Sequence, residues 1–265
     1  MHDFAFLLPV TVICELIGVP EGDREMFRPI ARALVATLEP EMSKEQLAEA
    51  DAAAIQLNSY LADLIAQRRA SPRGDLLSAL VDISDAADGR LSDTELRDNL
   101  TLLLLAGFET TANLLGNGLK IILDDPQIGD AVRDGEVPVS AFVEEVLRFD
   151  SPVQMTSRRR NDGVEVGGVM AAPGDEFVTI LGAGNRDPHR FAKPDSFDPA
   201  RSDGGPISFG GGAHFCIGAA LARLEAAAAF PRILHRFPKL RAAGEPVRKQ
   251  GLVLRGYESL PVFPG

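Results

Sequence analysis

Residues 209–218 have the sequence FGGGAHFCIG, and this stretch is the most informative part of the chain about its fold. Three consecutive glycines let the backbone approach something large and flat. They lead to Cys216, where an Ala-rich helix over about 216–236 is predicted to begin. The positive end of a helix dipole and nearby N–H groups favour a thiolate, the form of cysteine that binds a metal.

Other interpretations of the glycine-rich stretch fit it less well. The phosphate-loop pattern G-x-x-x-x-G-K-[ST] is not matched, and the dinucleotide pattern G-x-G-x-x-G fails because Phe215 replaces its last glycine. A zinc site needs further ligands, and only His214 is near in the sequence. On this stretch alone, a glycine turn beside a buried cysteine remains an alternative.

A long helix is predicted from Ser92 to Leu123. Ser92 and Glu95 form a capping box at its start, and the sequence DDP at residues 124–126 ends it. The segment 102–107 is apolar on every side, which predicts that it is buried on every side.

The middle of this helix has the sequence AGFETT at residues 106–111. A glycine within a helix costs about 1 kcal/mol relative to alanine, so Gly107 marks a weak point. An acid beside an alcohol, at Glu109 and Thr110, suggests a local distortion that makes room for a ligand and moves protons. The alternative is a helix that merely emerges into solvent at Glu109.

Glu145 and Arg148 lie three residues apart in a predicted helix over 139–149 and can form an ion pair. Taken alone, such a pair is usually a surface salt bridge. The following irregular stretch, residues 185–215, is rich in Pro, Gly and Asp and contains Arg201. Its phenylalanines predict a packed meander.

The remaining patterns predict a mainly α protein with minor β structure. Residues 1–123 are mostly helical, with breaks at 20–23, 71–74 and 85–89. Short strands are predicted within 153–181, where Val, Gly and Thr alternate with turn signals. The tail, residues 238–265, also has the pattern of short strands.

Together these segments resemble the cytochrome P-450 family of haem-thiolate monooxygenases, of the soluble bacterial type. Residues 209–218 fill every position of the family's haem signature, F-G-x-G-x-[HR]-x-C-x-G, and residues 106–110 match its oxygen-activation motif, A-G-x-[DE]-T. Glu145 and Arg148 match its E-x-x-R pair, and Arg201 matches the arginine that completes the cluster. The resemblance implies the cytochrome P-450 fold.

The resemblance also implies which residues bind the cofactor, haem b. Cys216 would be the proximal iron ligand, and Phe209 would pack beside the haem near the sulfur. His214 and Arg158 would bind the haem propionates through charge-assisted hydrogen bonds. The glycines of the signature are Gly210, Gly212 and Gly218.

On the opposite side of the haem, the resemblance assigns roles to the long helix. Ala106 and Gly107 would open a groove for dioxygen. Thr110 would hold the activated oxygen through its hydroxyl, and Glu109 would relay protons to it. Three residues would be structural and would lock the meander that supports the cysteine loop: Glu145, Arg148 and Arg201.

The family is longer than this sequence. We therefore expect residues 1–265 to form a single but partial domain, truncated at its N-terminus. The helices expected before Met1, one of which supplies a further arginine to the haem, and the loop that covers the substrate are absent from it.

Charge and cysteine content limit the partners and the compartment. The net charge is −11, which makes nucleic acid a poor partner. Residues 201–265 nevertheless have nine Lys or Arg and four Asp or Glu, a net of +5 that leaves −16 for the first 200 residues. This basic quarter predicts a docking face for an acidic protein, although a merely solvated surface is the alternative. Two cysteines, no signal peptide and no membrane span predict a cytoplasmic protein.

The leading hypothesis is a monooxygenase that inserts one oxygen atom from O2 into a small hydrophobic substrate. The resemblance implies ferredoxin and ferredoxin reductase as electron donors. A haem-binding remnant or sensor without turnover is one alternative, and a helical interaction protein that binds no haem is another.

Overall fold

A computed structural model describes residues 1, 4–86, 89–159 and 162–265. Helices make up 55% of the described residues and strands 10%, which confirms the predicted class, mainly α with minor β. The chain forms two compact units, Met1–Ala112 and Asn113–Gly265. The division falls within the longest helix, α5 (Asp93–Asp124), so each unit is described separately.

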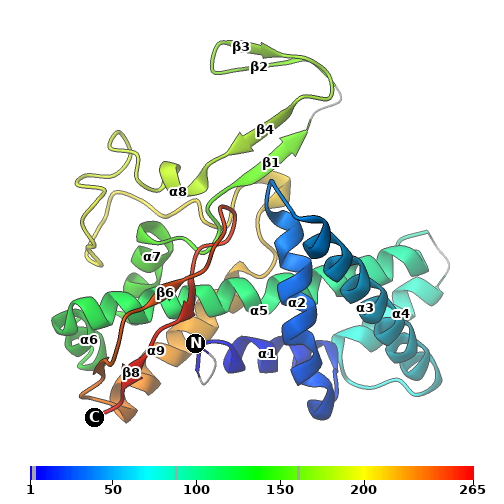
Figure 1. The fold of residues 1–265 in the computed structure, drawn as a ribbon, viewed down its shortest axis with the longest axis horizontal. Coiled ribbons are helices and arrows are strands. Elements are labelled where there is room, and N and C mark those ends of the chain that lie inside the picture. The colour runs from blue at the N-terminus through cyan, green and yellow to red at the C-terminus, as the bar shows by residue number, and fades with distance from the viewer. Residues whose placement is uncertain (2–3, 87–88, 160–161) are drawn as a thin grey trace. The chain divides into compact units, whose positions relative to one another are not determined.

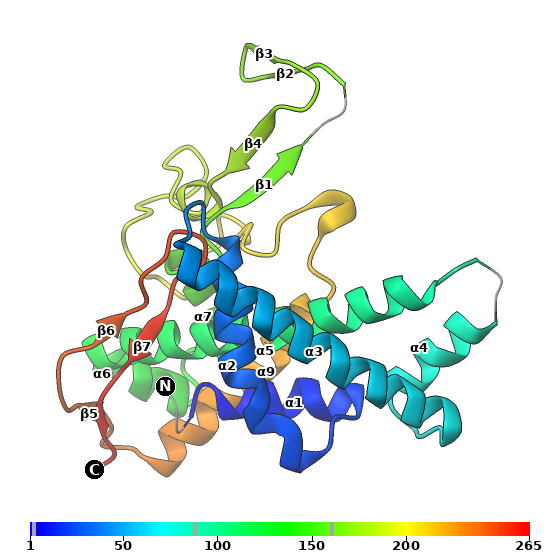
Figure 2. The ribbon, with the colours of Figure 1, turned by 45° about the vertical axis from the view of Figure 1, so that its right-hand side comes forward.

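Among its described residues, the first unit contains helices and the turns that connect them, and no strand. Helix α2 (Phe27–Val35) packs along α3 (Lys44–Ala70), and α3 packs against α4 (Leu76–Asp85) (Figure 2). Its core is built from apolar side chains of all its α-helices, with Ile13, Leu61 and Leu104 among those fully or almost fully buried. The elements, besides the first part of α5, are α1 (Leu7–Ile17), η1 (Glu21–Met26), α2 (Phe27–Val35), η2 (Ala36–Leu38), α3 (Lys44–Ala70) and α4 (Leu76–Asp85).

Local sequence signals explain where these helices begin. The Ser92 hydroxyl accepts from the Glu95 N–H at 3.2 Å, and the Glu95 carboxylate accepts from the Ser92 N–H at 2.8 Å. This confirms the predicted capping box of α5. Ser43 caps α3 in the same way, with Gln46 as its partner. The predicted turn at 85–89 includes residues 87–88, which lie outside the described residues.

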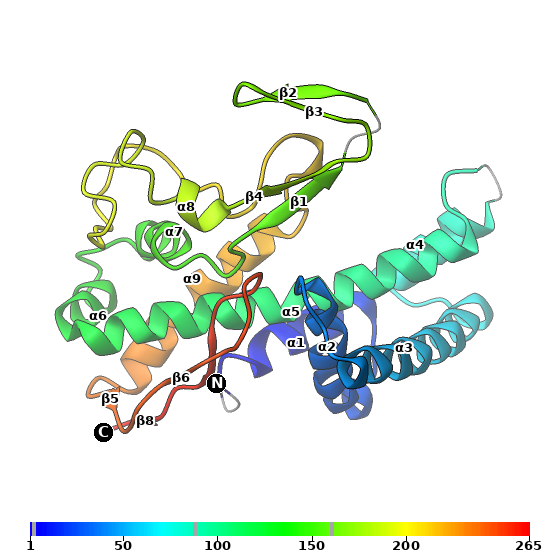
Figure 3. The ribbon, with the colours of Figure 1, turned by 45° about the horizontal axis from the view of Figure 1, so that its top comes forward.

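The second unit combines helices with four two-stranded antiparallel ribbons. The ribbon β2–β3 extends beyond the end of β1–β4 (Figures 1 and 3). Helix α9 packs against α6 and α7, where Phe142 and Phe230 meet edge to face at 5.0 Å. The helices are the last part of α5, α6 (Pro126–Arg133), α7 (Val139–Phe149), α8 (Leu181–Gly184), η3 (Gly212–His214) and α9 (Ala219–Arg236). The paired strands are β1 (Thr156–Arg159) with β4 (Glu176–Thr179), β2 (Val164–Val166) with β3 (Val169–Ala171), β5 (Arg241–Ala242) with β8 (Val262–Phe263), and β6 (Val247–Arg248) with β7 (Tyr257–Ser259).

The structure corrects three sequence predictions. The DDP stretch ends α5 but also starts α6, because Asp125 accepts from the Gln127 N–H and Pro126 fits the first helical turn. Helix α9 begins at Ala219 rather than at residue 216, so Cys216 lies in the loop before it. The segment 102–107 is not buried on every side: Leu104 is buried, but Leu102 is 62% exposed.

Among the described residues, no helix has both the length and the apolar character needed to cross a membrane.

Candidate active site

The loop at Cys216 is closed by a backbone hydrogen bond, from the Cys216 N–H to the Phe209 carbonyl at 3.0 Å. Gly210 and Gly212 have φ angles of +72° and +65°, which L-residues rarely adopt, so the path of the loop requires glycine there. A β-carbon added at Gly212 would meet nothing within 4 Å. The loop is therefore shaped by its glycines and is open on one side.

The surface around Cys216 is exposed and largely apolar. Cys216 itself is exposed, Ile217 is 91% exposed and Phe215 is 54% exposed. Among the described residues there is no cluster of three or more His, Cys, Asp or Glu side chains that could hold a metal ion. A single sulfur ligand on an open apolar surface fits a metal carried inside a flat macrocycle, as in a haem held by one cysteine thiolate.

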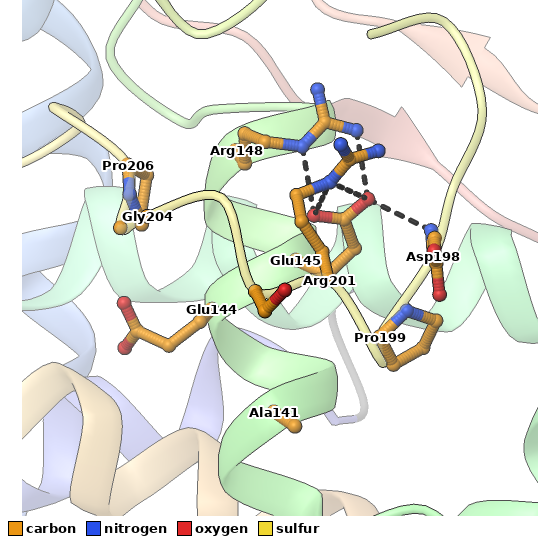
Figure 4. Close-up of a pocket in the computed structure, with 11 residues that line it drawn as sticks. Ala141, Glu144, Glu145, Arg148, Asp198, Pro199, Arg201, Gly204 and Pro206 are labelled. Carbon is orange, nitrogen blue, oxygen red and sulfur yellow. Dashed lines mark hydrogen bonds and ion pairs between the residues drawn. The ribbon is translucent and has the colours of Figure 1, made fainter. Parts of the chain in front are cut away.

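Glu145, Arg148 and Arg201 form one buried cluster in the second unit. Two parallel hydrogen bonds of 2.7 Å join the Arg148 guanidinium to the Glu145 carboxylate, and Arg201 Nε lies 3.3 Å from Glu145 Oε2. Both guanidinium groups converge on this carboxylate (Figure 4). Glu145 and Arg148 are 4% and 1% exposed, so the pair is not the surface salt bridge that its spacing alone suggests.

The same cluster holds the meander. Arg148 also donates to the backbone carbonyls of Asn185 at 3.0 Å, Pro194 at 2.8 Å and Ser196 at 3.0 Å. The Asp198 N–H donates to Glu145 Oε1 at 2.8 Å. A helix of regular structure thus fixes an irregular segment through charge-assisted hydrogen bonds.

A cavity of about 270 Å³ lies beside this cluster. Figure 4 shows Glu144 directed away from Glu145 at its edge. No residue of the 209–218 loop lines it, so it is distinct from the surface around Cys216. The lining residues are Ala141, Glu144, Glu145, Arg148, Asp198, Pro199, Arg201, Ser202, Gly204, Gly205 and Pro206.

Two links to the cysteine loop were missed from the sequence. Asn185 is fully buried, accepts from the Ile207 N–H at 2.8 Å and donates to Ser208 Oγ at 2.9 Å. Ser208 in turn donates to the Leu147 carbonyl at 2.7 Å, which joins the segment before the loop to α7. The only hint in the sequence was that Asn185 is a polar residue in a stretch otherwise interpreted as a packed meander.

The loop has a second support at the start of α9. The Arg223 guanidinium lies 4.5 Å above the Phe209 ring and forms an ion pair with Glu144 of α7. The hydrogen bonds to Glu144 raise the pKa of Arg223 and outweigh desolvation, which opposes its charged form. Arg223 therefore positions Phe209 rather than presenting a free charge.

The two residues predicted to bind the propionates are both exposed. His214 ends the short helix η3, two residues before Cys216. Arg158 lies on β1 and donates to Thr156 Oγ1 at 2.8 Å and to the Ser157 carbonyl at 2.7 Å. Neither of these bonds satisfies the charge of Arg158, which leaves its guanidinium suited to an anionic ligand.

The segment 106–111 of α5 lies in the first unit, and the predicted helix distortion is not seen there. All described residues from Asp93 to Asp124 are α-helical. Thr110 Oγ1 donates to the Ala106 carbonyl at 2.9 Å, and Glu109 is half-buried. Gly107 has a packing role, because a β-carbon there would lie 2.8 Å from Ile13 Cγ1.

Comparison with known proteins decides the family. The family model described as Cytochrome P450 matches residues 32–136 and 138–252. The chain belongs to the cytochrome P450 family. Cytochrome P450 107B1 of Saccharopolyspora erythraea is 43% identical over all of this chain and 64% of its own length. Cytochrome P450 monooxygenase PikC of Streptomyces venezuelae is 40% identical, over 99% of this chain and 62% of its own.

Solved cytochrome P450 structures share the fold. The crystal structure of P450BioI in complex with a hexadec-9Z-enoic acid ligated acyl carrier protein has a TM-score of 0.93 and 38% identity. The match covers 98% of this chain and 67% of that chain. Among the first curated relatives the chain spans 60% to 66% of their length.

Proposed function

We propose that this chain carries the catalytic core of a haem-thiolate monooxygenase, which inserts one atom of O2 into a small hydrophobic substrate. The observation that carries the proposal is the exposed thiol of Cys216 on an open, apolar, glycine-shaped loop. A relative named as a cytochrome P450 monooxygenase supports the reaction class. When bound, haem b with a thiolate ligand supplies the oxygen chemistry.

The residues of the second unit would bind and orient the cofactor. Cys216 would bind the iron, and Phe209, fixed by Arg223, would pack against the macrocycle. Arg158 and His214 would neutralise the propionates. The cluster of Glu145, Arg148 and Arg201, described above, would keep the loop in place without touching the cofactor.

The residues of α5 would control protons. The Thr110 hydroxyl now donates to the Ala106 carbonyl, and rotation about its χ1 angle would let it donate to a reacting oxygen instead. Glu109, the adjacent carboxylate, would supply the proton. Ala106 is exposed and small, so it would leave space for dioxygen above the helix.

We also propose ferredoxin and ferredoxin reductase as electron donors and the cytoplasm as the location. The basic quarter, residues 201–265, supports an acidic donor, but at least four of its nine cations are paired with carboxylates of the chain: Arg201, Arg223, Arg248 and Arg255. Arg232 and Arg236 have no carboxylate partner among the described residues and are the best candidates for docking. Two unpaired cysteines support a reducing compartment.

The test of turnover is Thr110→Ala, with Thr110→Ser as its matched control. The purified chain is loaded with haem, supplied with ferredoxin, reductase and a panel of hydrophobic substrates, and assayed for product and for hydrogen peroxide per electron consumed. We expect Thr110→Ala to retain haem and to release more peroxide per electron, whereas Thr110→Ser retains the coupling of the parent chain.

Two outcomes would contradict the proposal. Full haem occupancy with no product from any substrate would favour the haem-binding protein without turnover. Product formation with unchanged coupling in Thr110→Ala would place proton control on another part of α5.

A further inference from the structure

Two asparagines of α5, Asn113 and Asn117, are fully buried in the second unit. They lie four residues apart, so their side chains are neighbours on one face of the helix, with β-carbons about 5–6 Å apart. A buried polar group without a hydrogen bond destabilises the folded state, so each amide atom here needs a partner.

Asn117 is held in one orientation. Its Nδ2 donates to the Asp150 carbonyl at 2.8 Å and to the Arg255 carbonyl at 3.2 Å. These bonds join α5 both to the end of α7 and to the C-terminal segment that contains Arg255 and Gly256. Its Oδ1 therefore faces away from these carbonyls, is buried, and has no hydrogen-bond partner among the described residues. A carbonyl oxygen can be satisfied only by a donor.

Asn113 has the complementary need. Both its Nδ2 and its Oδ1 are buried, and neither has a partner among the described residues. Gly256 of the C-terminal segment lies directly against this amide, since a β-carbon added there would be 2.2 Å from Asn113 Oδ1. Asn113 thus offers the two N–H donors of its Nδ2 and the acceptor Oδ1 beside the acceptor of Asn117.

From these three atoms we propose a buried water-binding site that joins α5 to the C-terminal segment. A water bound here accepts from Asn113 Nδ2 and donates to Asn117 Oδ1, and its second hydrogen remains for another acceptor. Only a ligand that both donates and accepts meets this need, and a water with two to four polar partners is the usual solution.

A cation fits the site poorly. A metal ion would satisfy the oxygens but not the N–H donors of Asn113. Two guanidinium groups also lie near the contacts of Asn117: Arg248 and Arg255 both pair with the Asp150 carboxylate, at 3.0 and 2.6 Å. Their positive charge opposes a second cation. This water site is inferred without use of the proposed function.

The experiment is a high-resolution crystal structure of the chain, with oxygen-17 relaxation dispersion as a count of long-lived internal waters. We expect a density peak within about 3.2 Å of Asn113 Nδ2 and Asn117 Oδ1. The variant Asn113→Leu removes both polar atoms at similar volume and should lose about one long-lived water per molecule. The control is Asn99→Leu, an exposed asparagine of the same helix, which should lose none.

Two results would overturn the proposal. One is a direct hydrogen bond of the Asn113 amide to Asn117 or to the backbone, with no water between them. The other is a peak surrounded only by oxygens at about 2.3–2.6 Å, which would be a metal ion. The crystal structure of the parent chain decides both, so the test stands even if Asn113→Leu does not fold.

Discussion

The cluster at Arg148 and the loop at Cys216 lie in the same unit but treat their reactive groups in opposite ways. Arg148 is 1% exposed, and five hydrogen bonds satisfy its guanidinium within the chain. Cys216 is exposed and is flanked by Ile217 and Phe215, which are also exposed. A side chain whose hydrogen bonds are all made within the chain supports the fold. An exposed side chain without such bonds is available to a ligand.

The largest expected effect follows from breaking the cluster. Arg148→Leu leaves the Glu145 carboxylate buried beside a single remaining arginine, and removing one partner of a buried ion pair costs about 3–5 kcal/mol. We expect the free energy of unfolding, measured with urea, to fall by this amount. The control is Arg159→Leu, whose ion pair with Glu176 at 3.4 Å is exposed and should contribute little. Equal effects would show that the cluster is not the structural support described here.

A second prediction contrasts two buried glutamates. The Glu145 carboxylate is paired with Arg148 and Arg201, whereas Oε2 of Glu225 in α9 has no partner among the described residues. Burial raises the pKa of Glu225 from 4.5 to about 7. The folded state therefore holds this proton more tightly than the unfolded state. Below pH 4.5 Glu225 is protonated in both states, so its burial as a charge costs nothing. As the pH rises from 4.5 to about 7, the free energy of unfolding falls by at most about 3 kcal/mol.

Glu225→Gln removes this ionisation. We expect the variant to be more stable than the parent chain at pH 8 and to have a flatter dependence of unfolding free energy on pH between 4.5 and 7. Urea unfolding at a series of pH values measures both. An unchanged slope in the variant would assign the pH dependence to other groups.

A third prediction compares a glycine that permits packing with one that lies in the open loop. Gly107→Ala places a methyl group against Ile13, and overpacking of this kind costs about 1–3 kcal/mol, which exceeds the gain in helix propensity. Gly211→Ala adds a methyl group that meets nothing within 4 Å, so the haem-free chain should keep its stability. Ile13→Ala removes both close atoms, Cγ1 and Cδ1, so if Gly107→Ala costs as much in an Ile13→Ala background as in the parent chain, the packing explanation is wrong.

The smallest expected effect comes from comparing Arg223, which is paired with Glu144, with Arg232 and Arg236, which have no carboxylate partner among the described residues. Arg232→Ala and Arg236→Ala should each slow reduction by an acidic ferredoxin a few-fold at low salt and less at physiological salt, because screening weakens steering. Reduction rates by stopped flow at two ionic strengths measure this. Arg223→Ala should lose haem affinity through Phe209 instead, without a change in salt dependence. A rate independent of salt in the parent chain would contradict docking by this face.

Features encoded locally could be predicted from the sequence, and features set by distant segments could not. The capping box of Ser92 and the motif at Cys216 are local. The burial of Arg148 depends on backbone carbonyls some 40 to 50 residues later in the chain. The spacing between Glu145 and Arg148 does not predict these contacts. The exposure of Leu102 likewise depends on which tertiary neighbours cover that face of α5.

The central claim, that Cys216 alone binds the cofactor iron, is tested most directly by the carbon monoxide spectrum of the reduced, haem-loaded chain. Burial raises the pKa of the Cys14 thiol to about 11, so Cys14 stays protonated and unsuited to bind a metal. We predict a thiolate-type spectrum from the parent chain and from Cys14→Ser, and its loss in Cys216→Ser. A thiolate-type spectrum that persists in Cys216→Ser and disappears in Cys14→Ser would contradict the account.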